Sequence, residues 1–148
     1  MTIKLDDIDL EILSMLEKDA KARMHAIARK LGIPASTAHH RIKQMEKEGI
    51  ISGYTVRRDW KKMGFGLKAH VLVFADLVAL KHMKKTQQDI CNSLARVPGV
   101  ESSEIITGEA DLLITVRAHD MDEFRKVLLE KIQAIEGITE TKTMMVMG

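Results

Sequence analysis

Residues 24–42, MHAIARKLGIPASTAHHRI, have the pattern of two short helices joined by a tight turn. Apolar residues recur at the spacing of one helix face on both sides of Gly32: Met24, Ile27, Ala28 and Leu31, then Ala35, Ala38, Ile42 and Met45. Gly32 stands where a helix C-terminus favours a left-handed residue. The order helix, tight turn, helix predicts an element that reads DNA.

A supporting helix is expected before this pair and a short β segment after it. The first helix begins near Asp6 or Asp7, with Asp9 in its first turn, and buries Leu5, Ile8, Ile12, Leu13 and Leu16. Gly49 ends the third helix, and residues 50–56 have the composition of a two-stranded wing. We therefore predict a winged helix-turn-helix domain over residues 1–57 and a linker over residues 58–66.

From Leu67 the pattern changes to strand, helix, strand, strand, helix, strand. Strands are expected at residues 67–77, 104–107, 112–118 and 139–147. The apolar helix faces are Met83, Gln87, Ile90, Cys91, Leu94 and Val97, then Phe124, Val127, Leu128, Ile132 and Ile135. Asp120 and Glu123 mark the start of the second helix. This order predicts an α+β chain whose residues 67–148 form a βαββαβ ferredoxin-like domain.

The apolar runs of residues 71–75 and 112–114 predict a partner for the sheet. They are apolar on both strand faces, whereas helices cover only one face of a ferredoxin-like sheet. We therefore expect the second face to be buried in a homodimer.

Composition excludes several classes of protein. With 148 residues, 45% apolar and 30% charged, the chain has the make-up of a folded protein and not of a disordered one. No apolar run approaches the roughly 20 residues that span a bilayer, so we expect a cytoplasmic protein. The single Cys91 lies in a helical apolar pattern, which favours a small buried side chain over a nucleophile.

Charge is distributed unevenly along the chain. Residues 21–62 carry 11 Lys or Arg and 3 Asp or Glu, a local net charge of +8, whereas the whole chain carries +2. A basic block attracts a polyanion, because neutralised phosphates release their counterions. On charge alone, a solvated basic face is an equal alternative.

A set of short motifs spans the chain: Leu5-Asp6, Asp9, Ile12-Leu13, Ser36-Thr37, Arg41-Ile42, Met45-Glu46, Gly49, Ile51, Gly53-Tyr54, Gly108 to Asp111, Asp120-Met121, Gly137-Ile138 and Thr143-Met144. Together they resemble the Lrp/AsnC, or feast/famine, family of prokaryotic transcription regulators. Three residues depart from the family pattern. Pro34 replaces a helix-capping Ser, a role we expect Ser36 to take over, and Ala110 and Leu112 stand where aromatic residues are common.

The resemblance implies a small-molecule effector site between dimers. Its residues would be Gly108, Glu109, Ala110 and Asp111, with Thr141 and Thr143 of the last strand. Gly108 lets backbone amides approach a carboxylate, and Asp111 accepts from an amino group. Equally, Gly108 and Asp111 form only a tight turn between neighbouring strands. The resemblance further implies that dimers assemble into a tetramer or octamer.

We predict DNA contacts from the third helix and the segment after the wing: Ser36, Thr37, His39, His40, Arg41, Lys43, Lys47, Arg57 and Arg58. Neighbouring helix residues lie about 100° apart, so we assign base reading to His40 and a flanking contact to His39. Arg41 binds either a phosphate or a carboxylate of the protein itself. Adjacent histidines do not converge on a helix, which argues against a metal site.

These expectations favour a non-enzymatic transcription regulator that binds double-stranded DNA, with an amino-acid-like effector and no cofactor, metal or membrane partner. The nearest alternative is an architectural DNA-binding protein without effector. A haem-biosynthetic decarboxylase of similar architecture is disfavoured, because residues 67–148 show no His-Tyr pair or basic cluster suited to a tetrapyrrole. An RNA-binding ferredoxin-like module is also disfavoured, because stacking needs aromatic side chains and these make up only 3% of the chain.

Overall fold

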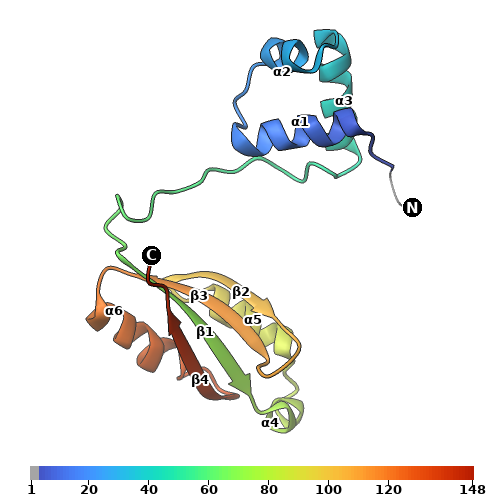
Figure 1. The fold of residues 1–148 in the computed structure, drawn as a ribbon. Helices are drawn as coiled ribbons and strands as arrows, with labels where there is room; N and C mark the ends of the chain where they lie inside the picture. The colour runs from blue at the N-terminus through green and yellow to red at the C-terminus, as the bar shows by residue number, and fades with distance from the viewer. Residues whose placement is uncertain (1–3) are drawn as a thin grey trace. The chain divides into compact units, whose positions relative to one another are not determined.

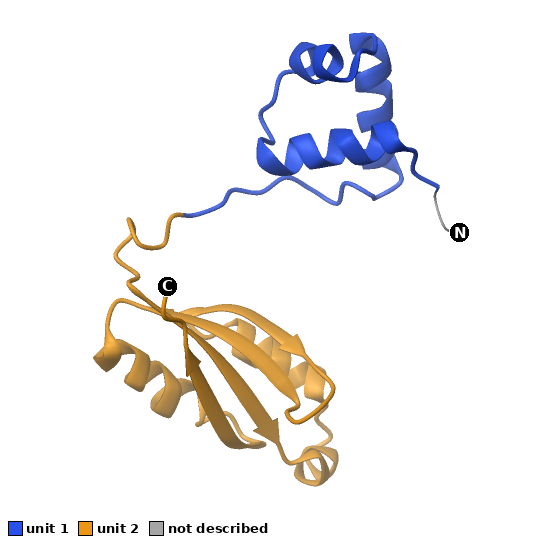
Figure 2. Cartoon of the chain, viewed as in Figure 1, with its two compact units in different colours: residues 1–58 blue, residues 59–148 orange. Residues whose placement is uncertain are grey.

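The chain divides into two units, residues 1–58 and residues 59–148 (Figure 2). This division comes from a computed structural model, which describes residues 4–148. Residues 59–66, which we expected to be linker, belong to the second unit. The predicted fold class is confirmed: a helix-turn-helix unit precedes a unit with the order βαββαβ.

The first unit consists of three helices, α1 (Asp7–Lys18), α2 (Met24–Leu31) and α3 (Ala35–Lys47), as Figure 1 shows. Amphipathic spacing places apolar side chains of all three helices in one core. Its central residues are at most 5% exposed: Ile12, Ile27, Ile42 and Met45. The other apolar residues predicted for the first helix pack around this centre.

Local interactions decide where these helices begin and end. Asp6 caps α1, because its carboxylate accepts from the Asp9 N–H at 2.9 Å and the Asp9 carboxylate accepts from the Asp6 N–H at 3.1 Å. α2 ends at Gly32, whose φ of +66° is the left-handed conformation that glycine adopts without strain. α3 follows Pro34 without a side-chain cap, so the expectation that Ser36 takes over as cap is wrong.

The two-stranded wing predicted for residues 50–56 does not form, because this segment contains no strand. The Ile51 N–H donates to the Met45 carbonyl at 3.1 Å, and the Tyr54 hydroxyl donates to Glu46 at 2.8 Å. These two hydrogen bonds attach the segment to α3. The chain therefore runs on from the helix instead of folding back into a hairpin.

The second unit is built on a four-stranded antiparallel sheet in the order β2-β3-β1-β4. The strands are β1 (Leu67–Ala75), β2 (Val100–Ile105), β3 (Leu112–Ala118) and β4 (Ile138–Met145). The helices are α4 (Leu77–His82), α5 (Gln87–Ala95) and α6 (Met121–Lys126), which continues as a π-helical stretch over Val127–Ile132. One face of the sheet packs against α5 and α6 in a core that includes Val71, Leu94, Ile114 and Phe124.

Several element boundaries in this unit differ from the prediction. β1 ends at Ala75 because the Asp76 carboxylate caps α4, accepting two backbone N–H groups at 2.9 and 3.0 Å. The single helix expected next is two helices, because Lys84 has a φ of +56° and Thr86 caps a new start. β2 also begins earlier than expected, at Val100.

The other face of the sheet carries the residues that alternate with those of the core. They are Lys68, His70, Leu72 and Phe74 of β1 and Leu113, Thr115 and Arg117 of β3. Directly paired residues share a face, so Leu72 lies beside Leu113, and His70 Nδ1 lies 3.1 Å from the Thr115 hydroxyl. α5 and α6 pack on the opposite face, so we call this surface the helix-free face.

Residues 59–66 are held on the second unit by an aromatic cluster. The Trp60 and Phe65 rings meet edge-on with their centroids 5.4 Å apart, and the Phe65 ring lies 4.2 Å from that of His119. The Arg117 guanidinium lies 5.1 Å from the centroid of Trp60. We call these four residues the aromatic anchor, and they fix the stretch that leads into β1.

Candidate nucleic-acid interface and effector loop

The side of α3 that faces away from the core brings together most of the predicted DNA-contacting residues. At about 100° per residue, Ala38, Ile42 and Met45 define the buried side. The opposite side consists of five exposed residues, which we call the outer face of α3: Ser36, His40, Lys43, Gln44 and Lys47. Thr37 and His39 are exposed at its two borders. A polar and basic helix side of this kind fits the major groove of DNA.

Gln44 belongs to the outer face but is absent from our sequence prediction. It lies one turn after His40, and its Nε2 donates to the Glu48 carboxylate at 3.0 Å. The prediction chose charged, imidazole and hydroxyl side chains. The helical count alone, applied to every polar residue of the helix, identifies Gln44 from the sequence.

Lys43 is paired within the first unit. Its Nζ lies 2.7 Å from one Glu46 carboxylate oxygen, and the other oxygen accepts from the Tyr54 hydroxyl at 2.8 Å. The hydrogen bond from Lys43, followed by that from Tyr54, lowers the pKa of Glu46. Burial, followed by the hydrogen bond to Glu46, raises the pKa of Tyr54. Glu46 thus offsets part of the Lys43 charge and ties the segment after α3 to the helix.

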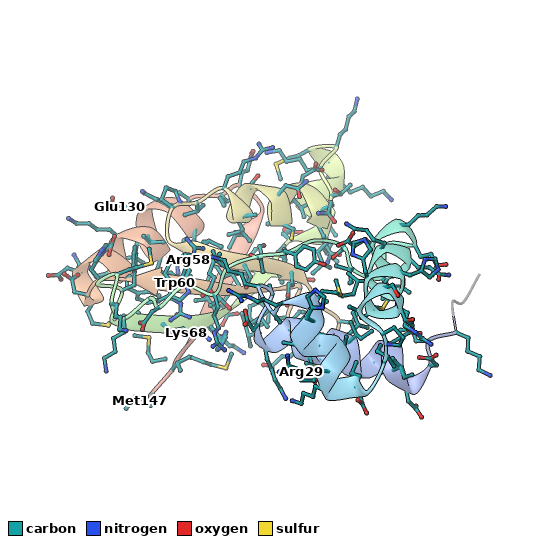
Figure 3. All side chains as sticks on the ribbon, turned by 90° about the horizontal axis from the view of Figure 1, so that it is seen from above. Arg29, Arg58, Trp60, Lys68, Glu130 and Met147 are labelled. Atoms are coloured by element: carbon teal, nitrogen blue, oxygen red, sulfur yellow. The ribbon has the colours of Figure 1, made fainter. Side chains whose placement is uncertain are left out.

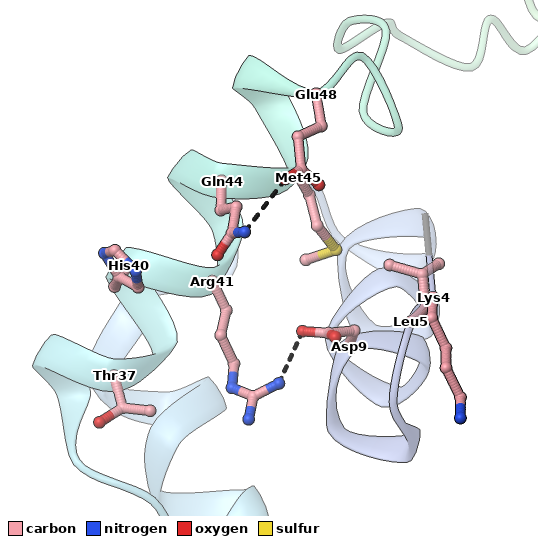
Figure 4. A pocket seen from close by; sticks show the side chains of 9 residues that line it. All are labelled: Lys4, Leu5, Asp9, Thr37, His40, Arg41, Gln44, Met45 and Glu48. Atoms are coloured by element: carbon pink, nitrogen blue, oxygen red, sulfur yellow. Dashed lines mark hydrogen bonds and ion pairs between the residues drawn. The ribbon is translucent and has the colours of Figure 1, made fainter. Parts of the chain in front are cut away.

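Arg41 points away from the outer face, toward the start of α1 (Figure 4). Its guanidinium lies 2.6 Å from Asp6 and 2.8 Å from Asp9, the two carboxylates that cap α1. The hydrogen bond from Arg41 lowers the pKa of Asp6, and the hydrogen bonds to Asp6 and Asp9 raise the pKa of Arg41. Of the two roles left open for Arg41, the structure has the carboxylate contact. Its contact with phosphate stays a prediction.

A cleft of about 360 Å³ lies between the start of α1 and α3 (Figure 4). Thr37, His40 and Gln44 line it from α3, and Lys4 and Leu5 line it from the segment before α1. The cleft therefore joins the polar surface of α3 to the segment before α1.

Further basic residues of the first unit come from outside α3. Arg57 and Arg58 lie in its last segment and are exposed, and Figure 3 labels Arg58. The last turn of α2 adds Arg29 and Lys30, both exposed, which our prediction does not name. Their sequence signal is the basic block of residues 21–62.

In the second unit, the loop between β2 and β3 holds four of the predicted effector residues. Gly108 has a φ of +129°, and no atom lies within 4 Å of a Cβ added there. The Glu109 carboxylate lies 2.9 Å from Lys142 Nζ of β4, which lowers the pKa of Glu109 and raises that of Lys142. Lys142 Nζ also lies 4.9 Å from the centroid of the Phe74 ring. A cation and an anion therefore meet beside Phe74 on the helix-free face.

Ala110 and Asp111 of the same loop face the protein interior. Ala110 is only 5% exposed. The Asp111 carboxylate accepts from the Ala75 N–H at 2.9 Å and from Gln87 Nε2 at 3.1 Å. Asp111 thus joins the loop to β1 and α5, which is a structural role. Its contact with an effector amino group stays a prediction.

Thr141 and Thr143 do not share a sheet face with the pair of Glu109 and Lys142. In β4 the two threonines lie opposite core residues of β1, whereas Lys142 between them lies on the helix-free face. The Thr141 hydroxyl accepts from Gln133 Nε2 at 2.8 Å. One copy of the chain therefore does not gather the six predicted effector residues on a single surface.

Over residues 4–148, no three His, Cys, Asp or Glu side chains are placed to hold a metal ion together. Within the same stretch, no helix combines the length and the apolar character needed to cross a membrane.

Two protein families match the chain. The Lrp/AsnC ligand binding domain matches residues 72–148, slightly more than half of the chain. The chain belongs to the Lrp/AsnC family. The winged helix-turn-helix DNA-binding family matches residues 5–52, which include all three helices of the first unit. This Lrp/AsnC protein is therefore a DNA-binding transcription regulator, as its motifs predicted.

Its relatives include proteins described as uncharacterised HTH-type transcriptional regulators. One from Pyrococcus furiosus is 38% identical over 140 residues, which cover 95% of this chain and 91% of the relative. One from Pyrococcus horikoshii is 35% identical with the same coverage.

Solved structures share the fold of this Lrp/AsnC protein. AsnC of Escherichia coli aligns with a TM-score of 0.85 at 24% identity, covering 99% of this chain and 94% of AsnC. A transcriptional regulator of Neisseria meningitidis, solved in complex with L-Met, aligns with a TM-score of 0.87 at 23% identity, covering 98% of this chain and 91% of that regulator.

Proposed function

We propose that this regulator binds specific DNA sequences by placing the outer face of α3 in the major groove. The observation that carries the proposal is the outer face itself, because its hydroxyl, imidazole, amide and ammonium groups lie opposite the buried side of the same helix. Ser36 and Thr37 lie in the first turn, where hydroxyl groups reach phosphates or base edges. His40 reads a base, and Lys47 and Arg57 bind phosphates.

The proposed DNA-binding form is a homodimer. A two-fold dimer places two recognition helices about 34 to 36 Å apart on a pseudo-palindromic site. The helix-free face supports this form, because Leu72, Phe74 and Leu113 give it an apolar centre. Two such faces pack together in the proposed dimer, and dimers assemble further into a tetramer or octamer.

The proposed effector is an amino acid or a similar small metabolite, and the proposed role of the second unit is binding without catalysis. The family's ligand-binding domain covers residues 72–148, and the Neisseria meningitidis neighbour was solved with L-Met. In this chain Gly108 offers an open backbone, and Glu109 and Lys142 present the two charges that match a zwitterion. An effector that binds one assembly state better than another then changes DNA occupancy by linkage.

Fluorescence anisotropy with genomic duplexes at moderate salt tests the DNA-binding part. We expect some genomic duplexes to bind more tightly than random duplexes of the same length. Equal binding of all duplexes contradicts sequence-specific regulation. Calorimetry with each of the twenty amino acids tests the effector, and heat of binding from one or a few of them supports it.

An architectural DNA-binding protein without effector is the second candidate. Ala110 is buried and the Asp111 carboxylate already accepts two hydrogen bonds, which favours a closed loop without a ligand. Specific DNA binding with no heat from any amino acid would select this candidate over the first.

A further inference from the structure

We propose that Gln44 is a base-reading residue that selects an adenine in each half-site, and that Glu48 orients it for this role. The inference rests on the proposed placement of α3 in the major groove, and it names a residue that determines sequence preference there.

Gln44 lies on the side of the outer face of α3 that borders Thr37. It follows His40 by four residues and precedes Lys47 by three, so the three side chains are neighbours on one side of the helix. It is exposed and lies across the helix from the buried Ile42. The rise of about 1.5 Å per residue places Gln44 about 6 Å beyond His40 along the axis. That distance is close to two base-pair steps, so the two residues reach different bases.

The chemistry of an amide matches one base edge in particular. A glutamine presents a donor and an acceptor side by side, and adenine presents the complementary N7 acceptor and N6 donor in the major groove. The hydroxyl, imidazole and ammonium groups elsewhere on the outer face cannot offer this planar pair. Gln44 is the one amide side chain of α3, so an adenine preference falls to it.

Glu48 fixes which way this amide faces. The Glu48 carboxylate accepts from Gln44 Nε2 at 3.0 Å (Figure 4). A carboxylate can only accept, so the amide nitrogen faces Glu48 and the amide oxygen faces away from it. Nε2 carries a second proton, which stays available for adenine N7 while the oxygen accepts from N6. Holding the amide before DNA binds reduces the entropy lost on binding.

Two long side chains near Gln44, those of Arg41 and Lys43, are engaged elsewhere. Arg41 binds Asp6 and Asp9 at the start of α1, and Lys43 binds Glu46. Neither is directed at the base edge that Gln44 reaches. Direct reading by the middle of α3 therefore rests on His40 and Gln44.

Selection from a random duplex library with the full-length protein tests the inference, followed by competition titrations on single-base-pair variants of the selected duplex. We expect the wild type to prefer an A·T pair at one position of each half-site by about tenfold or more. Gln44→Ala should bind all four base pairs equally at that position and keep its other preferences. Gln44→Glu should prefer cytosine there, because a carboxylate accepts from cytosine N4.

Gln88→Ala is the matched control. Gln88 Nε2 makes the same kind of hydrogen bond, to Asn92 at 3.0 Å, on α5 of the second unit, so its loss should leave every base preference unchanged. Circular dichroism confirms that each variant keeps its helices.

Two results overturn the inference alone: unchanged base preferences in Gln44→Ala, or an equal loss of affinity for every duplex. A wild type that selects no sequence at all overturns the proposed function together with the inference. The two failures are therefore distinguishable.

Discussion

The outer face of α3 and the loop around Gly108 are both predicted binding surfaces, and the structure realises them differently. On α3, Ser36, His40 and Lys47 lie together because a helix repeats every 3.6 residues, so the sequence of one element defines a complete surface. Around Gly108, the predicted residues lie on two elements whose side chains alternate between opposite faces. A surface formed by one helix can thus be predicted from the sequence of that helix. A surface formed by two elements cannot, because local sequence patterns do not show which elements lie side by side.

The largest effect is expected from the loss of a buried side chain that holds α3 in the core of the first unit. Ile42 is 5% exposed in the core of the first unit, so Ile42→Ala should cost about 2 to 5 kcal/mol of stability. We expect the first unit to melt at a lower temperature and DNA binding to be lost, while the second unit stays folded. Thermal unfolding by circular dichroism and DNA titration measure both effects. Ile114→Ala is the matched control, because it makes the same change in the core of the second unit. Unimpaired DNA binding by Ile42→Ala would contradict the role of α3.

Substitutions at two glycines of the second unit distinguish a crowded backbone position from an open loop. A Cβ at Gly137 lies 2.5 Å from Leu80 Cδ2, and φ there is +100°, so Gly137→Ala should lose about 2 to 4 kcal/mol through strain and overlap together. Gly108→Ala meets no atom within 4 Å, so it should lose less, about 1 to 2 kcal/mol, through backbone strain alone. Urea unfolding ranks the two variants. If Gly108→Ala also leaves amino-acid binding unchanged, the loop is not the effector site.

Lys47→Ala tests the phosphate contact on the outer face. Removal of one phosphate contact in each protomer should weaken binding to every duplex by about fivefold per protomer near physiological salt. It should also reduce the slope of log K against log salt concentration by about 1 per protomer. Lys131→Ala, which removes an exposed lysine of the second unit, should change neither quantity. A sequence-dependent loss in Lys47→Ala would make Lys47 a base reader instead.

The smallest expected effect concerns the ion pair that fastens α3 to α1. The hydrogen bond from Arg41 lowers the pKa of Asp6 below its ordinary value of 3.8. A carboxyl group with a lowered pKa in the folded state stabilises the fold above that ordinary value, and the contribution is lost as pH falls through the folded-state pKa. Because Asp6 is exposed, the effect at neutral pH is small.

We therefore expect Asp6→Asn to be slightly less stable than the wild type at neutral pH, by an amount that shrinks as the pH falls below 3.8. Urea midpoints of the first unit, measured across that range, check this. Asp7→Asn is the control, because Asp7 is not an ion-pair partner of Arg41. A difference between Asp6→Asn and the wild type that does not shrink as the pH falls below 3.8 contradicts the assignment.

The sequence predicted the three helices, the four strands and their order because each of these rests on a local period. The prediction missed the helix break before α5, although its signal is in the sequence, since Thr86 and Asp89 form a capping pair three residues apart. The wing was wrong because its β composition was outweighed by contacts that Ile51 and Tyr54 make with α3.

Other features of the candidate site could not be read from local sequence. Arg41 finds its partners Asp6 and Asp9 across 35 and 32 residues, and no periodicity connects them. The ion pair of Glu109 and Lys142 similarly joins a loop to a strand 33 residues later. Residue type identified Arg41 as a candidate and the family resemblance identified Glu109, and only the fold decides what each one binds.

The aromatic anchor limits the length of the flexible tether between the two units. Because Tyr54 is bound to α3 and the rings of Trp60 and Phe65 attach residues 59–66 to the second unit, the part of the chain left as a tether is about residues 55–58, which extends to about 14 Å at most. In a dimer whose first α3 is bound to its half-site, a short tether keeps the second α3 at a high effective concentration near the other half-site. Loss of the Trp60 ring would lengthen the tether and weaken the avidity of the dimer for DNA, although no contact to DNA is removed.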